Sequence, residues 1–93
     1  MLEFNANNID ELESEAMQRA HEVSVGVVTS VIKALEADVD KVIIGIMVTV
    51  DLDLTVERSG YLQALQTNLV RCEEAEEYEL CKAAIKWIKK LSK

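Results

Sequence analysis

Side chains that could carry out chemistry are few in this sequence. His21 is the only histidine, so no second histidine can share a metal ion with it at a helical spacing. Ser24, Ser30 and Ser59 have no partner for nucleophilic catalysis other than His21, and none lies in a glycine-framed turn. The three glycines are too far apart to form a phosphate-binding loop. We therefore expect no catalytic residue, no cofactor and no metal site, in a protein that is not an enzyme.

The two cysteines, Cys72 and Cys81, lack the CxxC spacing of redox and metal motifs. Each lies within an apolar row of an expected helix, where a free cysteine behaves as a small hydrophobic residue. We expect both to be reduced and buried, as in a cytoplasmic protein.

The most concentrated polar feature is a run of glutamates around one tyrosine between residues 73 and 79. One interpretation is a solvated corner whose acids favour a helix N-terminus. The other is a docking patch for a basic partner, with the tyrosine as its aromatic anchor. A di-metal carboxylate site is disfavoured because the Glu-x-x-His pairs are missing. The candidate partner-binding residues are Glu73, Glu74, Glu76, Glu77, Tyr78, Glu79, Leu80 and Trp87.

Apolar residues on both sides of this acidic run recur every three or four positions, which predicts two amphipathic helices. The short connection allows only an antiparallel return, so residues 60–92 are expected to form a helical hairpin. The second helix carries a second apolar row that includes Trp87, and lysines occupy its opposite face. That stripe is wider than one partner helix can cover. Trp87 should therefore meet another part of this chain, a second copy or a partner.

The spacing L-x-x-C-x5-Y-E-x-C-x6-I-x-x-L, from Leu69 to Leu91, resembles the UVR motif. That motif is a short helical hairpin of bacterial excision-repair subunits and some protease-associated proteins. The resemblance covers about a third of the chain and implies a protein–protein docking role. The sequence departs from the motif at Ile85-Lys86, where the family usually has an Arg-Asp pair.

The first third of the chain is predicted to be one long helix over residues 9–36, after a flexible lead over 1–7 from which Phe4 can reach the core. Asn8 followed by Glu11 has the form of a helix N-cap. Glu22 to Val28 is ambiguous, because its valines alternate as in a strand and Gly26 weakens a helix. The helical spacing on both sides of that stretch favours the helix.

Residues 41–57 are predicted to be one long central β-strand, because every even position from Val42 to Val56 is apolar. Such a strand needs a partner for its backbone groups. The possible partners are Glu22 to Val28, a hairpin folded at Gly45, or the same strand of a second copy. The competing interpretation is a buried helix over 41–54, which would make the fold an all-α bundle of about four helices instead of an α+β domain.

The net charge of −7 is unevenly distributed, because residues 1–60 carry 12 acidic and 4 basic side chains (−8) and residues 61–93 carry +1. Because no aromatic-rich basic patch is present, direct nucleic-acid binding is not expected. No signal peptide or membrane-spanning run is evident either. With 93 residues, we expect a single small domain over 1–93.

These features favour a non-enzymatic interaction protein, a small acidic cytoplasmic adaptor or regulator that binds a protein partner and forms a homo-oligomer. The alternative is an acidic inhibitor or nucleic-acid mimic of the viral kind, which acts on a nucleic-acid-handling enzyme.

Overall fold

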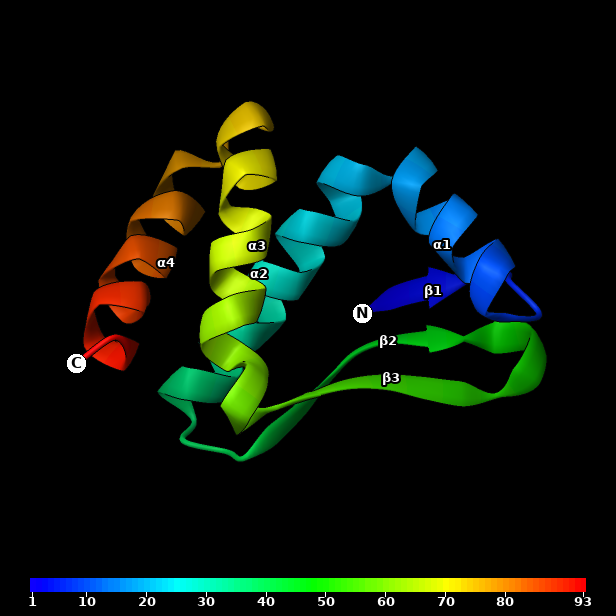
Figure 1. The fold of residues 1–93 in the computed structure, drawn as a ribbon, viewed down its shortest axis with the longest axis horizontal. Coiled ribbons are helices and arrows are strands. Elements are labelled where there is room, and N and C mark those ends of the chain that lie inside the picture. Colours follow the sequence, from blue (N-terminus) through cyan, green and yellow to red (C-terminus); the bar gives the residue numbers. More distant parts are fainter.

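Four α-helices and a three-stranded sheet make up the protein, which is therefore α+β (Figure 1). The computed structural model describes all residues from 1 to 93. The elements are β1 (Leu2–Phe4), α1 (Ile9–Gln18), α2 (Ala20–Glu36), β2 (Lys41–Met47), β3 (Leu52–Glu57), α3 (Tyr61–Glu74) and α4 (Tyr78–Leu91). The expected α+β class is confirmed, and the all-α alternative is wrong.

Helix α2 lies at the centre of the fold. It contacts β2 of the sheet, and it also packs against α3 and α4 (Figure 1). Val28 and Val31 of this helix are fully buried, together with Tyr61 and Leu65 of α3. The valines of the ambiguous stretch 22–28 lie within α2, so the helical interpretation of that stretch is confirmed. Tertiary packing outweighs the β-propensity of its valines.

The single helix expected over residues 9–36 is wrong, because the chain breaks at Arg19 into α1 and α2. Arg19 has φ −114° and ψ 32°, which is not a helical conformation. Its guanidinium donates hydrogen bonds to the carbonyl of Glu3 at 2.7 Å and to the carboxylates of Glu15 at 2.9 Å and Glu22 at 2.7 Å. These bonds tie the junction to β1. The break lets α1 turn back above the sheet (Figure 1). A straight helix would instead have carried these residues away from the sheet.

Helix α1 begins where the sequence predicts. The backbone N–H of Glu11 donates to the Asn8 side-chain oxygen at 2.9 Å, as in an N-cap. The Glu11 carboxylate in turn accepts from the Asn7 backbone N–H at 3.0 Å. The helix has no buried residue, so polar bonds to the preceding loop contribute much of its attachment.

The single strand expected over residues 41–57 is also wrong. The chain folds back within it, and β2 and β3 form an antiparallel hairpin. The reversal lies at Val48–Val50, a 3-10 turn, and at Asp51, whose φ of 51° is left-handed. It lies several residues beyond Gly45. Because the two halves satisfy each other's backbone hydrogen bonds, the sheet does not need the strand of a second copy.

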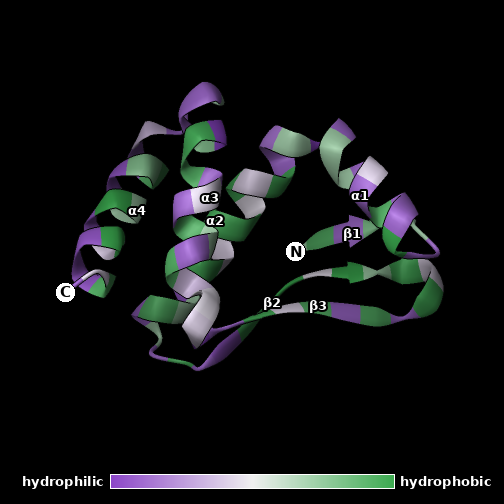
Figure 2. Ribbon diagram, in the orientation of Figure 1, coloured by the Kyte–Doolittle hydropathy of each residue, from purple (hydrophilic) through white to green (hydrophobic).

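A β-bulge at Ile44 changes which residues face the core. The pairing register shifts between Ile43 and Gly45, which leaves Ile44 as an extra residue in β2. Beyond the bulge the odd-numbered Gly45 and Met47 are buried, while Ile46 lies opposite Asp53 on the other face. The even-numbered apolar pattern therefore does not continue along one face. Figure 2 shows how nearly all of β2 is hydrophobic, consistent with apolar residues on both faces.

The flexible lead expected over residues 1–7 instead contains β1, which pairs parallel to β2. Leu2, Phe4 and Ala6 are buried, so the start of the chain contributes to the core, as the sequence allowed for Phe4. Gly45 makes room for this strand, since a Cβ there would lie 3.0 Å from the Leu2 carbonyl oxygen. Three residues give too little local pattern to predict a strand.

We predict that Phe4→Ala lowers the free energy of unfolding by about 3–5 kcal/mol, because a side chain only 3% exposed is lost from the core. Phe4→Leu should cost about 1 kcal/mol. Urea unfolding followed by circular dichroism measures both.

The matched control is Met1→Ala, because Met1 is exposed at the same end of the chain. It should change stability by no more than about 0.5 kcal/mol. Equal effects of Phe4→Ala and Met1→Ala would show that β1 is not part of the folded core.

Candidate functional site

The helical hairpin expected over residues 60–92 is present as α3 and α4, which contact each other along their length (Figure 1). Cys72 and Cys81 are both buried free cysteines in this packing. Helix α4 also contacts α2, so α2 and α3 together cover most of its two apolar rows, and Ile85 remains exposed. This contact explains the wide apolar stripe of α4 without a second protein.

The connection between α3 and α4 is a Schellman motif. The backbone N–H of Glu77 donates to the Cys72 carbonyl at 3.1 Å, and that of Glu76 donates to the Glu73 carbonyl at 3.0 Å. Glu76 lies in the left-handed region with φ 62°. Glycine usually occupies this position, because a Cβ makes the left-handed conformation unfavourable by roughly 1 kcal/mol. Glu76 therefore makes the turn less stable than glycine would at the same position.

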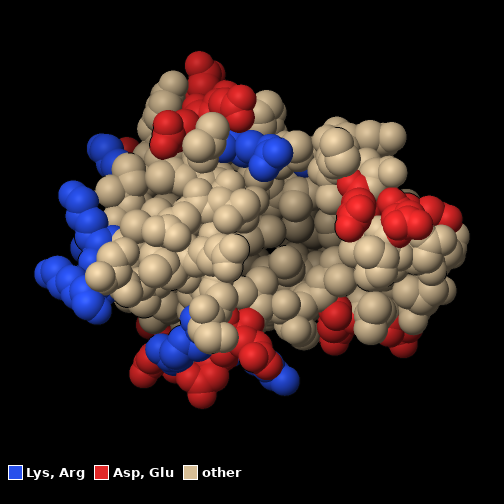
Figure 3. Space-filling model, in the orientation of Figure 1, with Lys and Arg blue, Asp and Glu red and all other residues tan.

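We call the six exposed side chains of this connection the acidic corner. They are Glu73, Glu74, Glu76, Glu77, Tyr78 and Glu79. Figure 3 shows acidic side chains gathered above the join of the two helices. The structure thus brings together six of the eight candidate residues, all exposed to solvent.

Few charges oppose the acidic corner. Glu79 lies 3.6 Å from the Lys82 ammonium, and Glu74 lies 3.7 Å from His21, which is charged only when protonated. Such exposed pairs contribute at most about 1 kcal/mol. The carboxylates of Glu73, Glu76 and Glu77 form no ion pair, so they are available to a cationic partner.

Leu80 and Trp87 do not join the acidic corner. Both are half-buried and pack against the core. Trp87 is nine residues beyond Tyr78, or about 13 Å along the helix at 1.5 Å per residue. The ammonium of Lys90 lies 4.7 Å from the centre of its ring, a cation–π distance. Trp87 is therefore mainly a packing residue of the hairpin.

The lysines of α4 form a separate basic surface, which we call the lysine face. It consists of Lys82, Lys86, Lys89, Lys90 and Lys93, all exposed. Figure 3 shows these cations along one edge of the molecule, away from most of the acids. Ile85 is exposed between them, so the surface is not purely polar.

Outside the hairpin, Ser24, one of the serines considered as a nucleophile, has a structural role. The Ser24 hydroxyl is buried and donates to Asn68 Oδ1 at 2.9 Å. No three His, Cys, Asp or Glu side chains gather closely enough to hold a metal ion. No helix has both the length and the apolar character needed to cross a membrane.

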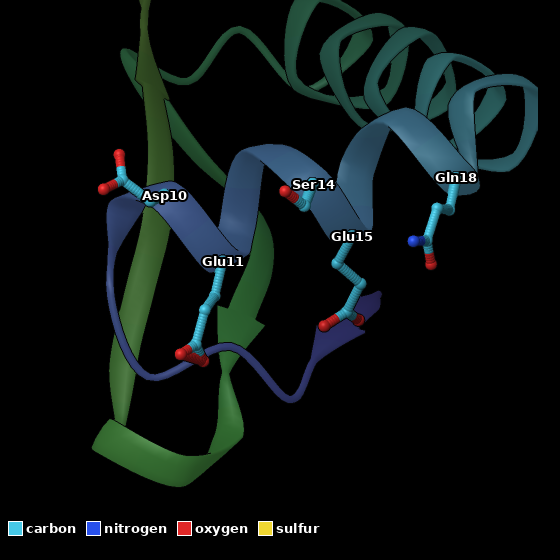
Figure 4. Close-up of a pocket in the computed structure, with 5 residues that line it drawn as sticks. All are labelled: Asp10, Glu11, Ser14, Glu15 and Gln18. Carbon is cyan, nitrogen blue, oxygen red and sulfur yellow. The ribbon is translucent and has the colours of Figure 1, made fainter.

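The sequence does not predict a shallow depression along α1, which Figure 4 shows with its polar side chains. It is lined by Asp10, Glu11, Ser14, Glu15 and Gln18. Glu11 and Glu15 accept hydrogen bonds from the backbone N–H groups of Asn7 and Asn5, each at 3.0 Å. These two carboxylates therefore hold the β1–α1 loop, and the only signal for them in the sequence is the N-cap at Asn8.

Burial makes both cysteines poor nucleophiles. Desolvation raises the pKa of Cys72 to about 11, and the neighbouring Cys81 and glutamates add to the effect. Desolvation also raises the pKa of the Cys81 thiol. Because the thiolate is the reactive species, both side chains act as core residues near neutral pH.

Comparison of the chain with protein-family models, with curated proteins and with solved structures finds no match.

We predict that the folded protein loses stability as the pH rises from about 8.5 towards 11. An unfolded thiol titrates at about pH 8.5, whereas the folded Cys72 titrates at about 11. Between these values the unfolded chain releases a proton that the folded chain keeps, so the free energy of unfolding falls with pH. Cys72→Ala should flatten this slope, as measured by urea unfolding across that range.

Val31→Ala is the control, because it removes buried volume without removing a titrating group. It should lower stability at every pH and leave the slope as in the wild type. A slope unchanged in Cys72→Ala would contradict the assignment of a buried thiol.

Proposed function

We propose that this protein is a non-enzymatic docking module, a small acidic adaptor or regulator whose acidic corner binds a basic segment of a partner protein. The reduced cysteines suit a cytoplasmic setting. We further propose that the protein associates with itself. The exposed corner of the helical hairpin is the basis of the docking role.

The observation that carries this proposal is the conformation of Glu76. At a helix end, glycine is the most stable residue in the left-handed conformation. Asp and Asn also tolerate this conformation because their side chains are short, whereas glutamate has a longer one. The chain nevertheless places a carboxylate there, in the connection between α3 and α4. Such a strained position at a surface corner supports a binding role for its side chain.

Tyr78 supplies the anchor that the carboxylates lack. Its side chain is 60% exposed at the first position of α4, between Glu77 and Glu79. Aromatic side chains of this kind contribute large contact area at little cost in conformational entropy. Charge would attract and orient the basic partner, and the ring would slow its dissociation.

The resemblance of residues 69–91 to the UVR motif supports the same role. In that motif a helical hairpin docks another protein, and here Tyr78-Glu79 stands where the motif has an aromatic residue followed by Glu. The apolar seam of α3 and α4 accounts for the remaining matched positions, since Leu69, Cys72 and Cys81 pack in it.

We predict that Glu76→Gly makes the protein more stable and its docking weaker. The free energy of unfolding should rise by about 0.4–1 kcal/mol, because glycine adopts the left-handed conformation without strain. Affinity capture from an extract of the native host, quantified by mass spectrometry, should recover less partner. Tyr78→Ala should also reduce the capture, with stability changed by no more than about 0.5 kcal/mol.

Asp38→Gly is a matched control. Asp38 also has a left-handed φ, of 55°, at the end of a helix, and its carboxylate is also exposed. This variant also replaces an exposed acidic residue in the left-handed region by glycine, far from the acidic corner, and it loses the ion pair with Arg58 as well. If it reduced capture as much as Glu76→Gly, the corner would not be the docking surface.

A further inference from the structure

Exposed apolar side chains gather at the end of the molecule formed by the β2–β3 turn and the start of α1. We call this surface the hairpin end, and it consists of Ile9, Val48, Val50 and Leu52. The Thr49 hydroxyl donates to the Ala6 carbonyl at 2.8 Å, which holds the turn against the loop before α1. Figure 1 shows the turn and that loop side by side. Four exposed aliphatic residues at one end are an apolar surface without a partner.

Acidic residues surround the hairpin end. Residues 9–18 and 48–54 carry a net charge of −6 and contain no lysine or arginine. The acids are Asp10, Glu11, Glu13, Glu15, Asp51 and Asp53. Of these, only Glu15 forms an ion pair, with Arg19. The other five carboxylates lack a cationic partner, so the end is strongly negative.

The lysine face of α4 has the complementary properties. Residues 78–93 carry five lysines and one glutamate, a net charge of +4. Only Lys82 is in an ion pair, and Ile85 provides an exposed apolar side chain among the cations. The molecule is 38 Å long, and Figure 3 shows the lysines at one edge and acids over α1 and the β2–β3 hairpin at the other.

We propose that the hairpin end of one copy docks on the lysine face of a second copy, head to tail. Two hairpin ends would bring five unpaired carboxylates against five more, and two lysine faces would bring a net +4 against +4. Only the unlike contact attracts, and it places Val50 and Leu52 against the Ile85 region of α4. The inference rests on the self-association proposed above and names the surfaces that would produce it.

A head-to-tail contact has a distinctive consequence. Each pair keeps one free hairpin end and one free lysine face, so unless the contacts close into a ring the assembly grows with concentration. The attraction is electrostatic at exposed surfaces and should weaken with salt. A twofold contact would instead stop at the dimer.

The experiment is a mixing test by sedimentation velocity at low salt. One variant, Val50→Lys with Asp53→Lys, disables the hairpin end, and another, Lys86→Glu with Lys89→Glu, disables the lysine face. All four side chains are exposed, and circular dichroism checks the fold. We expect the wild type to assemble and each variant alone to be monomeric. An equimolar mixture should form a pair of twice the monomer mass and nothing larger, since each variant keeps one working surface.

Charge-matched controls place the same changes elsewhere on exposed positions. They are Glu36→Lys with Gln66→Lys for the hairpin end, and Lys33→Glu with Arg71→Glu for the lysine face. Both controls should assemble as the wild type does. Raising the salt from about 50 mM to about 500 mM should weaken the wild-type association by about tenfold or more.

Each other outcome overturns the inference. If the mixture stays monomeric, or if the hairpin-end variant assembles as well as the wild type, the protein associates through another face and only this contact is wrong. A wild type that stays monomeric at every concentration overturns this contact and the self-association together. Docking at the acidic corner has its own test in the capture experiment.

Discussion

Burial of α2 is the interaction on which the rest of this structure depends. The helix lies between the sheet and the α3–α4 hairpin, and its fully buried Val28 and Val31 contribute to the one cluster of buried apolar residues that joins β1, α2, α3 and α4. Each such side chain stabilises the fold by about 1.5–3 kcal/mol. The two charged ends of the molecule, the hairpin end and the lysine face, are held apart because this helix separates them.

The sequence predicts those elements of the fold that depend on residues close together in the chain. The helical hairpin followed from apolar residues every three or four positions, and the start of α1 followed from Asn8 and Glu11. The strand β1 and the break at Arg19 did not, because both depend on residues distant in sequence. Phe4 needs the core, and Arg19 bonds to the carbonyl of Glu3 sixteen residues away.

The β2–β3 hairpin shows why a regular pattern can mislead. Apolar residues continue at even positions through the turn itself, as Val48, Val50 and Leu52, and the turn contains no glycine, proline or asparagine. Asp51 takes the left-handed conformation instead. The bulge at Ile44 then moves the core face from even to odd positions. Neither the turn nor the bulge interrupts the alternation of apolar residues, so the sequence pattern does not reveal them.

The acidic candidates could be predicted as a group because they are adjacent in sequence, whereas Trp87 was a candidate because its apolar stripe is wider than one partner helix can cover. The structure separates it from the corner and covers it with the core and Lys90. The three left-handed residues are all acidic, Asp38, Asp51 and Glu76. They place charge at three chain reversals.

Amide hydrogen exchange of the native protein tests the central role of α2 most directly. We predict that the amides of residues 24–35 exchange most slowly, because their exposure requires global unfolding. The amides of α1, which has no buried residue, should exchange much faster although both segments are helical. Equal protection of α1 and α2 would contradict the account, since it would show one continuous cooperative helix in place of a buried centre with a separately attached arm.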